Sequence, residues 1–166
     1  HAEDFERLLK VEGGEAGVAL TQNYRSQLMT PSTITCQQVE DKQRIQHTAD
    51  LFGIRFPLNI EPAIYSIASN IATEYRGAYW EFYSLSNGGF YMAPCSDKAY
   101  QVSCDNGFEG MLSADALGIT ACLYAYSHLS FTANPAFADI CSNHYQWLRA
   151  YMLEHAEASA ILSAID

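Results

Sequence analysis

The chain has 166 residues, of which 49% are hydrophobic, so we expect a single domain with a buried core rather than an intrinsically disordered protein. Its 19 acidic and 9 basic residues give a net charge of −10, which argues against direct binding of DNA or RNA through phosphate contacts. No apolar run reaches the roughly 18 to 20 residues that cross a bilayer, so we expect no membrane association.

Residues 1–32 have the composition of a leader. A short amphipathic fragment is followed by EGGEAG and by a polar stretch that ends at Pro31. The chain begins at His1 rather than at a methionine, so we expect residues 1–32 to be a mobile leader, processed or vector-derived in part, with Met29 as an alternative natural start. Residues 33–166 are expected to form the single folded domain.

Two helices are predicted before the central part of the chain. Residues 35–52 are mostly polar with apolar side chains at helical spacing, which predicts a surface helix that ends near Gly53. The segment 55–62 holds two prolines and is expected to be a connection. Pro62 suits the first position of a second helix, whose apolar residues recur at i, i+3, i+4 and i+7 as far as Tyr75.

The run EYRGAYWEFYSLSNGGFYMAP at residues 74–94 places seven aromatic residues around one turn. Asn87-Gly88 suits the central pair of a type I′ turn, in which both residues have positive φ. The aromatic segments on either side predict two paired strands.

Side chains alternate along the first of these strands. Trp80 and Phe82 therefore share one face, and Tyr79 and Tyr83 share the other. We expect Trp80 and Phe82 to be core residues. Alternation leaves open whether the tyrosines pack inward or are exposed for protein recognition.

Four strands are predicted in the middle of the chain: residues 79–85, 89–93, 99–104 and 108–112. The separators SNGG, PCSDK and DNG are short and turn-prone. The predicted topology is therefore an antiparallel β-meander of about four strands, with one face covered by helices.

The C-terminal part of the chain predicts helices. Ser113 can cap a helix over residues 114–129, and Asp115 lies near its positive end. This helix is apolar nearly all round, so it is expected to be central and buried. An Asn-Pro pair begins an amphipathic helix over residues 134–152, and a short helical segment follows at residues 159–165. The order of helices, strands and helices predicts an α+β fold with flanking α-helices.

Five cysteines lack the spacing of a disulfide framework: Cys36, Cys95, Cys104, Cys122 and Cys141. This odd set is typical of a reducing compartment, so we expect a cytoplasmic protein. Cys122 and Cys141 fall within helical patterns, where a free cysteine acts as a small buried hydrophobe.

The sequence carries no strong catalytic or metal-binding motif. Cys141 and His144 lie three residues apart, but no CxxC or HExxH spacing supports zinc. The chain also lacks G-x-S-x-G, a P-loop and G-x-G-x-x-G. We therefore expect no catalytic residue, no cofactor and no metal; a hydrolase would require a pocket with convergent titratable groups.

Negative charge is concentrated in the C-terminal part. From Ala99 onward, Arg149 is the only Lys or Arg, against seven Asp and Glu residues. Such a surface can steer a basic partner. A mimic of duplex DNA would need about one charge per 1.7 Å of length, and the acidic residues of this chain are sparser than that.

Three blocks of the sequence resemble the ArdB/KlcA antirestriction proteins of plasmids, phages and genomic islands. They are the aromatic run at residues 74–94, NGFEGMLSADALGI at residues 106–119, and AEASAILSAID at residues 156–166. The resemblance spans roughly residues 50–166. Where family members often have His-Pro-Glu, this chain has an alanine at position 156, a better helix former.

The resemblance implies a compact α+β fold and a non-enzymatic function, the relief of host type I restriction-modification, so that incoming mobile DNA escapes cleavage. The implied partner is a host type I restriction-modification enzyme or an associated host factor in the bacterial cytoplasm. The alternative hypothesis is an acidic electrostatic decoy that occupies the DNA-binding groove of a restriction enzyme.

Seven polar or aromatic residues of the three blocks form the candidate partner-binding surface: Tyr79, Glu81, Tyr83, Asn87, Asp115, Glu157 and Asp166. Structural explanations compete with this hypothesis. Asn87 suits turn geometry, Asp115 suits a helix N-terminus, and Asp166 suits a solvated chain end.

Overall fold

A computed structural model describes residues 33–166, in which Ile34–Asp166 form one compact unit. The predicted leader over residues 1–32 lies outside the described residues. The strands are β1 (Cys36–Gln38), β2 (Trp80–Leu85), β3 (Phe90–Pro94), β4 (Ala99–Ser103) and β5 (Glu109–Ser113). The helices are the 3₁₀ helix η1 (Asp41–Gln43), α3 (Arg44–Phe52), the π-helix η2 (Phe56–Ile60), α4 (Glu61–Ile71), α5 (Ala114–Leu129), α6 (Pro135–Met152) and α7 (Ala158–Ile165).

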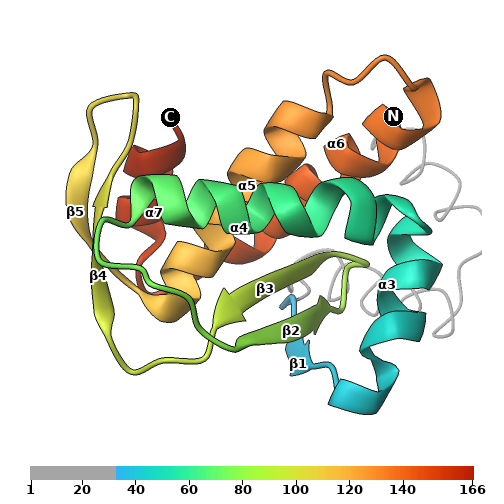
Figure 1. The fold of residues 1–166 in the computed structure, drawn as a ribbon, viewed down its shortest axis with the longest axis horizontal. Coiled ribbons are helices and arrows are strands. Elements are labelled where there is room, and N and C mark those ends of the chain that lie inside the picture. The colour runs from blue at the N-terminus through green and yellow to red at the C-terminus, as the bar shows by residue number, and fades with distance from the viewer. Residues whose placement is uncertain (1–32) are drawn as a thin grey trace, which may run out of the picture. The chain divides into compact units, whose positions relative to one another are not determined.

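The α+β class and the four antiparallel central strands are confirmed, but the strands divide into two sheets. One sheet has the order β1-β2-β3 and the other pairs β4 with β5, so the predicted meander is not continuous. Figure 1 shows the two-stranded sheet at the left beside α7 and the three-stranded sheet below α4 and α5.

The division has a physical cause at the edge of β3. Two backbone carbonyls of β3 accept hydrogen bonds from side chains of α5. The carbonyl of Phe90 accepts from the hydroxyl of Tyr126 (2.8 Å), and the carbonyl of Met92 accepts from the thiol of Cys122 (3.6 Å). A strand edge presents unpaired carbonyls that require partners when buried. Helix α5 supplies those partners, so β4 does not pair with β3.

Gly118 allows α5 to lie directly on β3. A Cβ atom at this position would lie 2.4 Å from both the Cβ atom of Ala93 and the carbonyl oxygen of Met92. The absence of a side chain therefore permits the close approach of helix and strand.

The turn between β2 and β3 differs from the predicted type I′ turn. Among the described residues only glycines have positive φ, so Asn87 does not, whereas Gly88 has φ 99°. The N–H of Gly88 donates to the carbonyl of Leu85 (3.0 Å), and the N–H of Leu85 donates to the carbonyl of Gly89 (2.9 Å). This pattern is typical of a three-residue hairpin loop with a glycine bulge, which requires one residue with positive φ rather than two.

An asparagine attaches each hairpin to a helix. The side-chain amide of Asn87 donates to the carbonyl of Trp147 in α6 (2.9 Å). In the β4–β5 hairpin, Asn106 likewise donates to the carbonyls of Ser163 (3.0 Å) and Ala164 (3.1 Å) in α7. The oxygen of each amide accepts the N–H two residues further on, which fixes both the turn and its contact with the helix.

The N-terminal part of the domain differs from the predicted single helix over residues 35–52. Residues 36–38 instead form β1, which pairs antiparallel with β2, and the N–H of Val39 donates to the carbonyl of Phe82 (2.7 Å). The predicted connection at residues 55–62 is largely helical, because Pro57 and Pro62 occupy starting positions of η2 and α4, where a missing N–H is tolerated.

The core matches the sequence prediction closely. Trp80 and Phe82 are 3% and 6% exposed, and Cys122 and Cys141 are buried. Helix α5 is buried nearly all round and packs against α4, α6, α7 and β3. None of the helices formed by residues 33–166 has the length and hydropathy needed to span a membrane.

Candidate functional site

A polar cluster lies where α5 begins and where the chain passes from α6 to α7. Ser113 caps α5, and its hydroxyl oxygen accepts the N–H of Ala116 (3.1 Å). The carboxylate of Glu157 accepts the N–H of Ser113 (2.9 Å) and also the Ser113 hydroxyl proton. An acidic group near a helix N-terminus is stabilising, so Glu157 both satisfies the cap and fixes the start of α7 to α5.

Asp115, in the first turn of α5, uses both carboxylate oxygens. One accepts the hydroxyl proton of Tyr91 (2.8 Å), and the other lies 2.8 Å from Nε2 of His155. Nδ1 of His155 accepts the N–H of Glu157 (2.9 Å), so in the neutral ring Nε2 carries the proton and donates to Asp115. The hydrogen bond to Asp115 raises the pKa of His155, while burial opposes this shift.

Three tyrosines stack beside this cluster. The ring of Tyr91 lies 4.8 Å from that of Tyr83 and 5.9 Å from that of Tyr151, in both cases nearly parallel. Burial and the nearby Asp115 raise the pKa of the Tyr91 hydroxyl far above its ordinary value. Burial also raises the pKa of the Cys36 thiol, which contacts the Tyr91 hydroxyl, so this cysteine stays protonated and weakly nucleophilic.

We name Tyr91, Ser113, Asp115, His155 and Glu157 the α5 cluster. Its carboxylates already accept hydrogen bonds from within the chain, and the side chain of Asp115 remains 38% exposed. The arrangement therefore offers a rigid, negatively charged surface rather than a free nucleophile or general base.

A second group of contacts surrounds Arg44 in α3. Its guanidinium lies 3.0 Å from the carboxylate of Glu81 and 3.1 Å from that of Asp41, and it donates to the carbonyl of Trp80 (2.8 Å). The cation also lies over the ring of Tyr79, 4.8 Å from its centroid. Arg44 thereby connects α3 to the start of β2.

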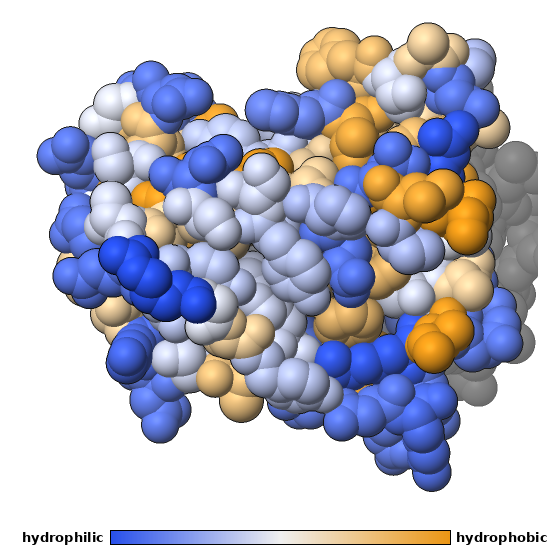
Figure 2. Space-filling view, in the orientation of Figure 1, coloured by the Kyte–Doolittle hydropathy of each residue, from blue (hydrophilic) through white to orange (hydrophobic). Residues whose placement is uncertain are grey.

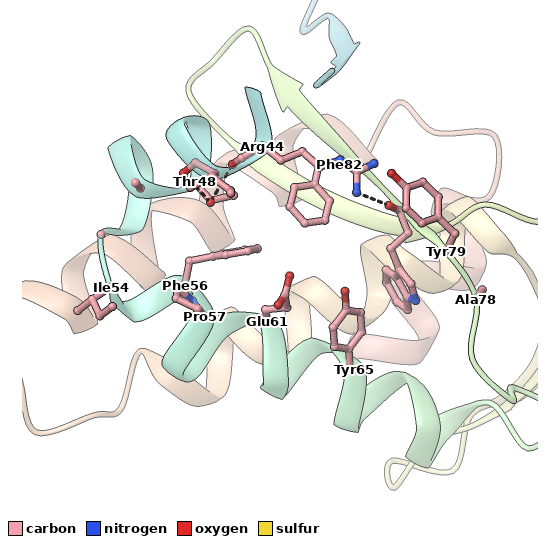
Figure 3. A pocket seen from close by; sticks show the side chains of 14 residues that line it. Arg44, Thr48, Ile54, Phe56, Pro57, Glu61, Tyr65, Ala78, Tyr79 and Phe82 are labelled. Atoms are coloured by element: carbon pink, nitrogen blue, oxygen red, sulfur yellow. Dashed lines mark hydrogen bonds between the residues drawn. The ribbon is translucent and has the colours of Figure 1, made fainter. Parts of the chain in front are cut away.

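Beside Arg44 is a pocket with a volume of about 620 Å³, bounded by α3, η2, α4 and β2 (Figure 3). Aromatic residues line it: Phe56, Tyr65, Trp80 and Phe82. The carboxylate of Glu61 points into the space between them. Burial raises the pKa of Tyr65 to about 12 and also raises the pKa of Glu61.

The structure divides the predicted partner-binding residues among separate places. Asp115 and Glu157 meet in the α5 cluster, and Tyr83 stacks on it through Tyr91. Tyr79 and Glu81 lie instead at Arg44.

The remaining two residues are isolated from these groups. Asn87 anchors the hairpin on α6, as described above, which supports its structural explanation. Asp166 is exposed after the last turn of α7, where its N–H donates to the carbonyl of Leu162 (3.0 Å).

Sequence reasoning missed Tyr91, His155 and Arg44. The observed hairpin sets Tyr91 opposite Tyr83. The predicted two-residue turn at Asn87-Gly88 would have shifted the register by one residue and set Ser84 opposite Tyr91, so the prediction did not indicate this stacking.

The spacing of Asp41 and Arg44 is a local signal for their ion pair. No local signal points to the contacts of Arg44 with Trp80 and Glu81, which lie 36 and 37 residues away in β2.

The weak zinc hypothesis gains no support from residues 33–166, where no group of three or more His, Cys, Asp and Glu side chains could hold a metal ion. Cys141 and His144 are both buried in α6. Burial lowers the pKa of His144 to about 4.

Residues 73–166, more than half of the chain and including the whole α5 cluster, match the family model for antirestriction proteins. This chain belongs to the antirestriction protein family, as its three sequence blocks indicated.

Particular relatives are KlcA antirestriction proteins from Escherichia coli. One is 42% identical over 141 residues, which cover 82% of this chain and 96% of the relative, and another is 39% identical over 80% of this chain and 95% of the relative. A protein described as uncharacterized, YafX of Escherichia coli strain K12, is 39% identical over 80% of this chain and 88% of its own length.

A solved structure is also similar to this chain, with a TM-score of 0.77 and 38% identity over 83% of this chain and 99% of the solved chain. The KlcA and ArdB proteins to which it belongs are described as having a novel fold and antirestriction activity against type I DNA restriction systems in vivo but not in vitro.

Proposed function

We propose that this chain relieves restriction by type I systems inside a bacterial cell, so that incoming mobile DNA escapes cleavage. The similarity to the KlcA and ArdB structure carries the proposal, because it covers nearly all of a solved chain for which activity against type I systems in vivo is described. At 38% identity and a TM-score of 0.77, the fold is shared.

The mechanism is a protein contact rather than catalysis. In the α5 cluster, Asp115 and Glu157 each accept two hydrogen bonds from within the chain, which occupies the oxygens that a general base would use. The raised pKa of Cys36 keeps the adjacent thiol protonated. These observations support a binding surface formed by the cluster, in which Asp115 is accessible and beside which Tyr83 stacks on Tyr91.

The partner is a type I restriction-modification enzyme or an associated host factor. The described activity of the KlcA and ArdB proteins in vivo but not in vitro supports a cellular component that a purified reaction lacks. An electrostatic decoy would compete with DNA in the purified reaction as well, and its effect would weaken steeply with salt. The decoy hypothesis is therefore the less supported of the two.

Plating of unmodified phage on a host with a type I restriction system tests the function. Expression of this chain should raise plating, whereas plating of modified phage, or of any phage on a non-restricting host, should not change. No rise despite good expression of folded protein would refute the proposal.

Substitutions within the same assay test the surface. Asp115→Asn should lower relief, while Asp105→Asn, an exposed acid in the β4–β5 turn, serves as the matched control and should leave relief unchanged. Thermal unfolding of both variants separates loss of contact from loss of folding. Equal relief by both variants would remove the α5 cluster from the partner-binding surface.

A further inference from the structure

The aromatic pocket bounded by α3, η2, α4 and β2 contains a carboxylate that forms no direct ion pair within residues 33–166. Glu61 is the first residue of α4, and its side chain points into the pocket (Figure 3). Within residues 33–166 it forms no hydrogen bond and no ion pair, and the hydroxyl of Tyr65, one helical turn later, has no hydrogen-bond partner there either. A carboxylate and a phenolic hydroxyl thus lie at this cavity, and neither forms a hydrogen bond with another group of the described residues.

Arg44 lines the same pocket, and its charge acts to lower the pKa of Glu61, but among the described residues the two side chains form no direct ion pair. The guanidinium of Arg44 already contacts the carboxylates of Glu81 and Asp41, at 3.0 and 3.1 Å. Because three acidic groups, counting Glu61, surround this single cation, this part of the molecule keeps an excess of negative charge. A second cation entering the pocket would therefore gain an ion pair.

The walls of the pocket favour a cation as well. Phe56, Tyr65, Trp80 and Phe82 line it, and aromatic ring faces attract ammonium and guanidinium groups. The guanidinium of Arg44 already lies over the ring of Phe82, 4.4 Å from the ring centroid, so an aromatic face in this pocket does contact a positive charge.

An exposed apolar patch surrounds the entrance. Ile45, Ile54 and Leu58 are 85%, 68% and 64% exposed, and the first two also line the pocket. Figure 2 shows apolar side chains gathered on the side of the molecule where α3 lies. Grouped exposed apolar residues with a polar surround mark protein interaction sites.

We propose that this pocket binds a lysine or arginine side chain presented by a partner protein, while Ile45, Ile54 and Leu58 contact apolar residues beside it. The inference rests on the proposed function, in that the partner is one through which the chain relieves restriction. The pairing is complementary in charge, because the chain carries a net charge of −10 and the pocket exposes a carboxylate that forms no direct ion pair within residues 33–166.

An NMR titration of the full chain tests the chemistry of the pocket. The probes are n-butylammonium and n-butylguanidinium, and n-butanol is the neutral control at equal ionic strength. The indole N–H of Trp80 reports on the pocket, and that of Trp147 in α6, which does not line it, is the internal reference.

Saturable shifts of the Trp80 signal should occur with both cations, with dissociation constants on the order of millimolar for ligands of so few atoms. Glu61→Gln should weaken this binding about tenfold, because it removes a charge-assisted contact. Glu109→Gln, an exposed acid on β5, should not weaken it. No shift, or an equal shift in Glu61→Gln, would overturn the proposal.

The phage-plating assay tests the role of the pocket in the cell. Glu61→Lys should lose relief of restriction while Glu109→Lys retains it, provided that both variants unfold at the wild-type temperature. Full relief by folded Glu61→Lys would overturn the docking proposal. If the wild-type chain itself gave no relief, the proposed function would fail, and the titration would still decide whether the pocket binds cations.

A second copy of this chain is the competing occupant. Light scattering measures the molar mass of the full chain and of the Ile54→Asp variant, and so distinguishes self-association from binding of a different protein. A monomer in both cases is expected. A wild-type dimer that becomes monomeric in Ile54→Asp would assign the patch to self-association and overturn the proposal.

Discussion

His144 is a buried histidine that the fold holds in its neutral form. It is 2% exposed, and its ring lies 4.4 Å from that of Phe52, 5.5 Å from that of Tyr126 and 5.1 Å from that of Trp147. Among the described residues its Nδ1 atom has no hydrogen-bond partner. Protonation would bury an uncompensated charge, so burial lowers the pKa of His144 to about 4 from 6.5.

This shift makes folding sensitive to acid. Below pH 6.5 the unfolded chain binds a proton at His144 and the folded chain does not, so the free energy of unfolding falls as the pH drops from 6.5 to about 4, by up to roughly 3 kcal/mol. The raised pKa of His155 has the opposite effect: it lowers the free energy of unfolding as the pH rises above 6.5. The two histidines therefore act in different pH ranges.

Replacing His144 with Gln should remove most of that acid sensitivity. Urea unfolding at a series of pH values between 4.5 and 7.5 measures the slope of the free energy of unfolding, which should be flatter in His144→Gln than in wild type. Absolute stability changes with packing, so the slope is the quantity to compare. His128→Gln, an exposed histidine at the end of α5, is the control and should keep the wild-type slope.

At the scale of elements, the sequence predicted correctly those features of helices and strands that depend on neighbouring residues. The cap at Ser113 and the Asn-Pro pair at residues 134–135 place the starts of α5 and α6 where the structure has them. Alternation likewise assigned Trp80 and Phe82 to the core. Each of these features depends on residues within one helix turn or one strand.

The features that the sequence could not provide depend on distant contacts. The division into two sheets follows from hydrogen bonds between α5 side chains and β3 carbonyls, which lie 30 and 36 residues apart. Strand β1 has three residues and exists through its pairing with β2. In the α5 cluster, Asp115 and Glu157 were predicted separately, but His155 joins them only through the turn between α6 and α7.

The contact between α5 and β3 predicts the effect of Gly118→Ala. Normally this exchange favours a helix by about 1 kcal/mol. Here the added Cβ atom would meet Met92 and Ala93 at 2.4 Å, so α5 must move away from the strand, at a cost of roughly 3 kcal/mol. Urea unfolding measures the loss, and the second substitution Ala93→Gly should restore part of it. A variant as stable as wild type would show that α5 does not depend on this close approach.

At the scale of the whole molecule, the acidic surplus is partly used within the fold. Asp41 and Glu81 neutralise Arg44, and Asp115 and Glu157 accept hydrogen bonds in the α5 cluster. The charge available to an external partner is therefore smaller than the net charge of −10 suggests. This distribution supports a local contact surface more than an extended imitation of DNA.

The extent of the family match leads to a prediction about the active unit. Matches over 80% and 82% of this chain cover 95% and 96% of the KlcA relatives, so about a fifth of the chain has no counterpart in them. Residues Ile34–Asp166 form one compact unit that holds both the α5 cluster and the aromatic pocket. We expect a variant of residues 34–166 to relieve type I restriction as well as the full chain does.

A deletion within residues 73–166, which match the family model, is the control for the 34–166 variant. Removal of α7 takes away the buried residues Ile161 and Ala164 and the carbonyls that anchor Asn106, so this variant should unfold at a lower temperature and lose relief of restriction. Phage plating and thermal unfolding, measured for all three chains, give the answer. If the 34–166 variant unfolded like the full chain but no longer relieved restriction, the first 33 residues would belong to the functional surface. Equal relief would instead assign the activity to the part of the chain that KlcA proteins share.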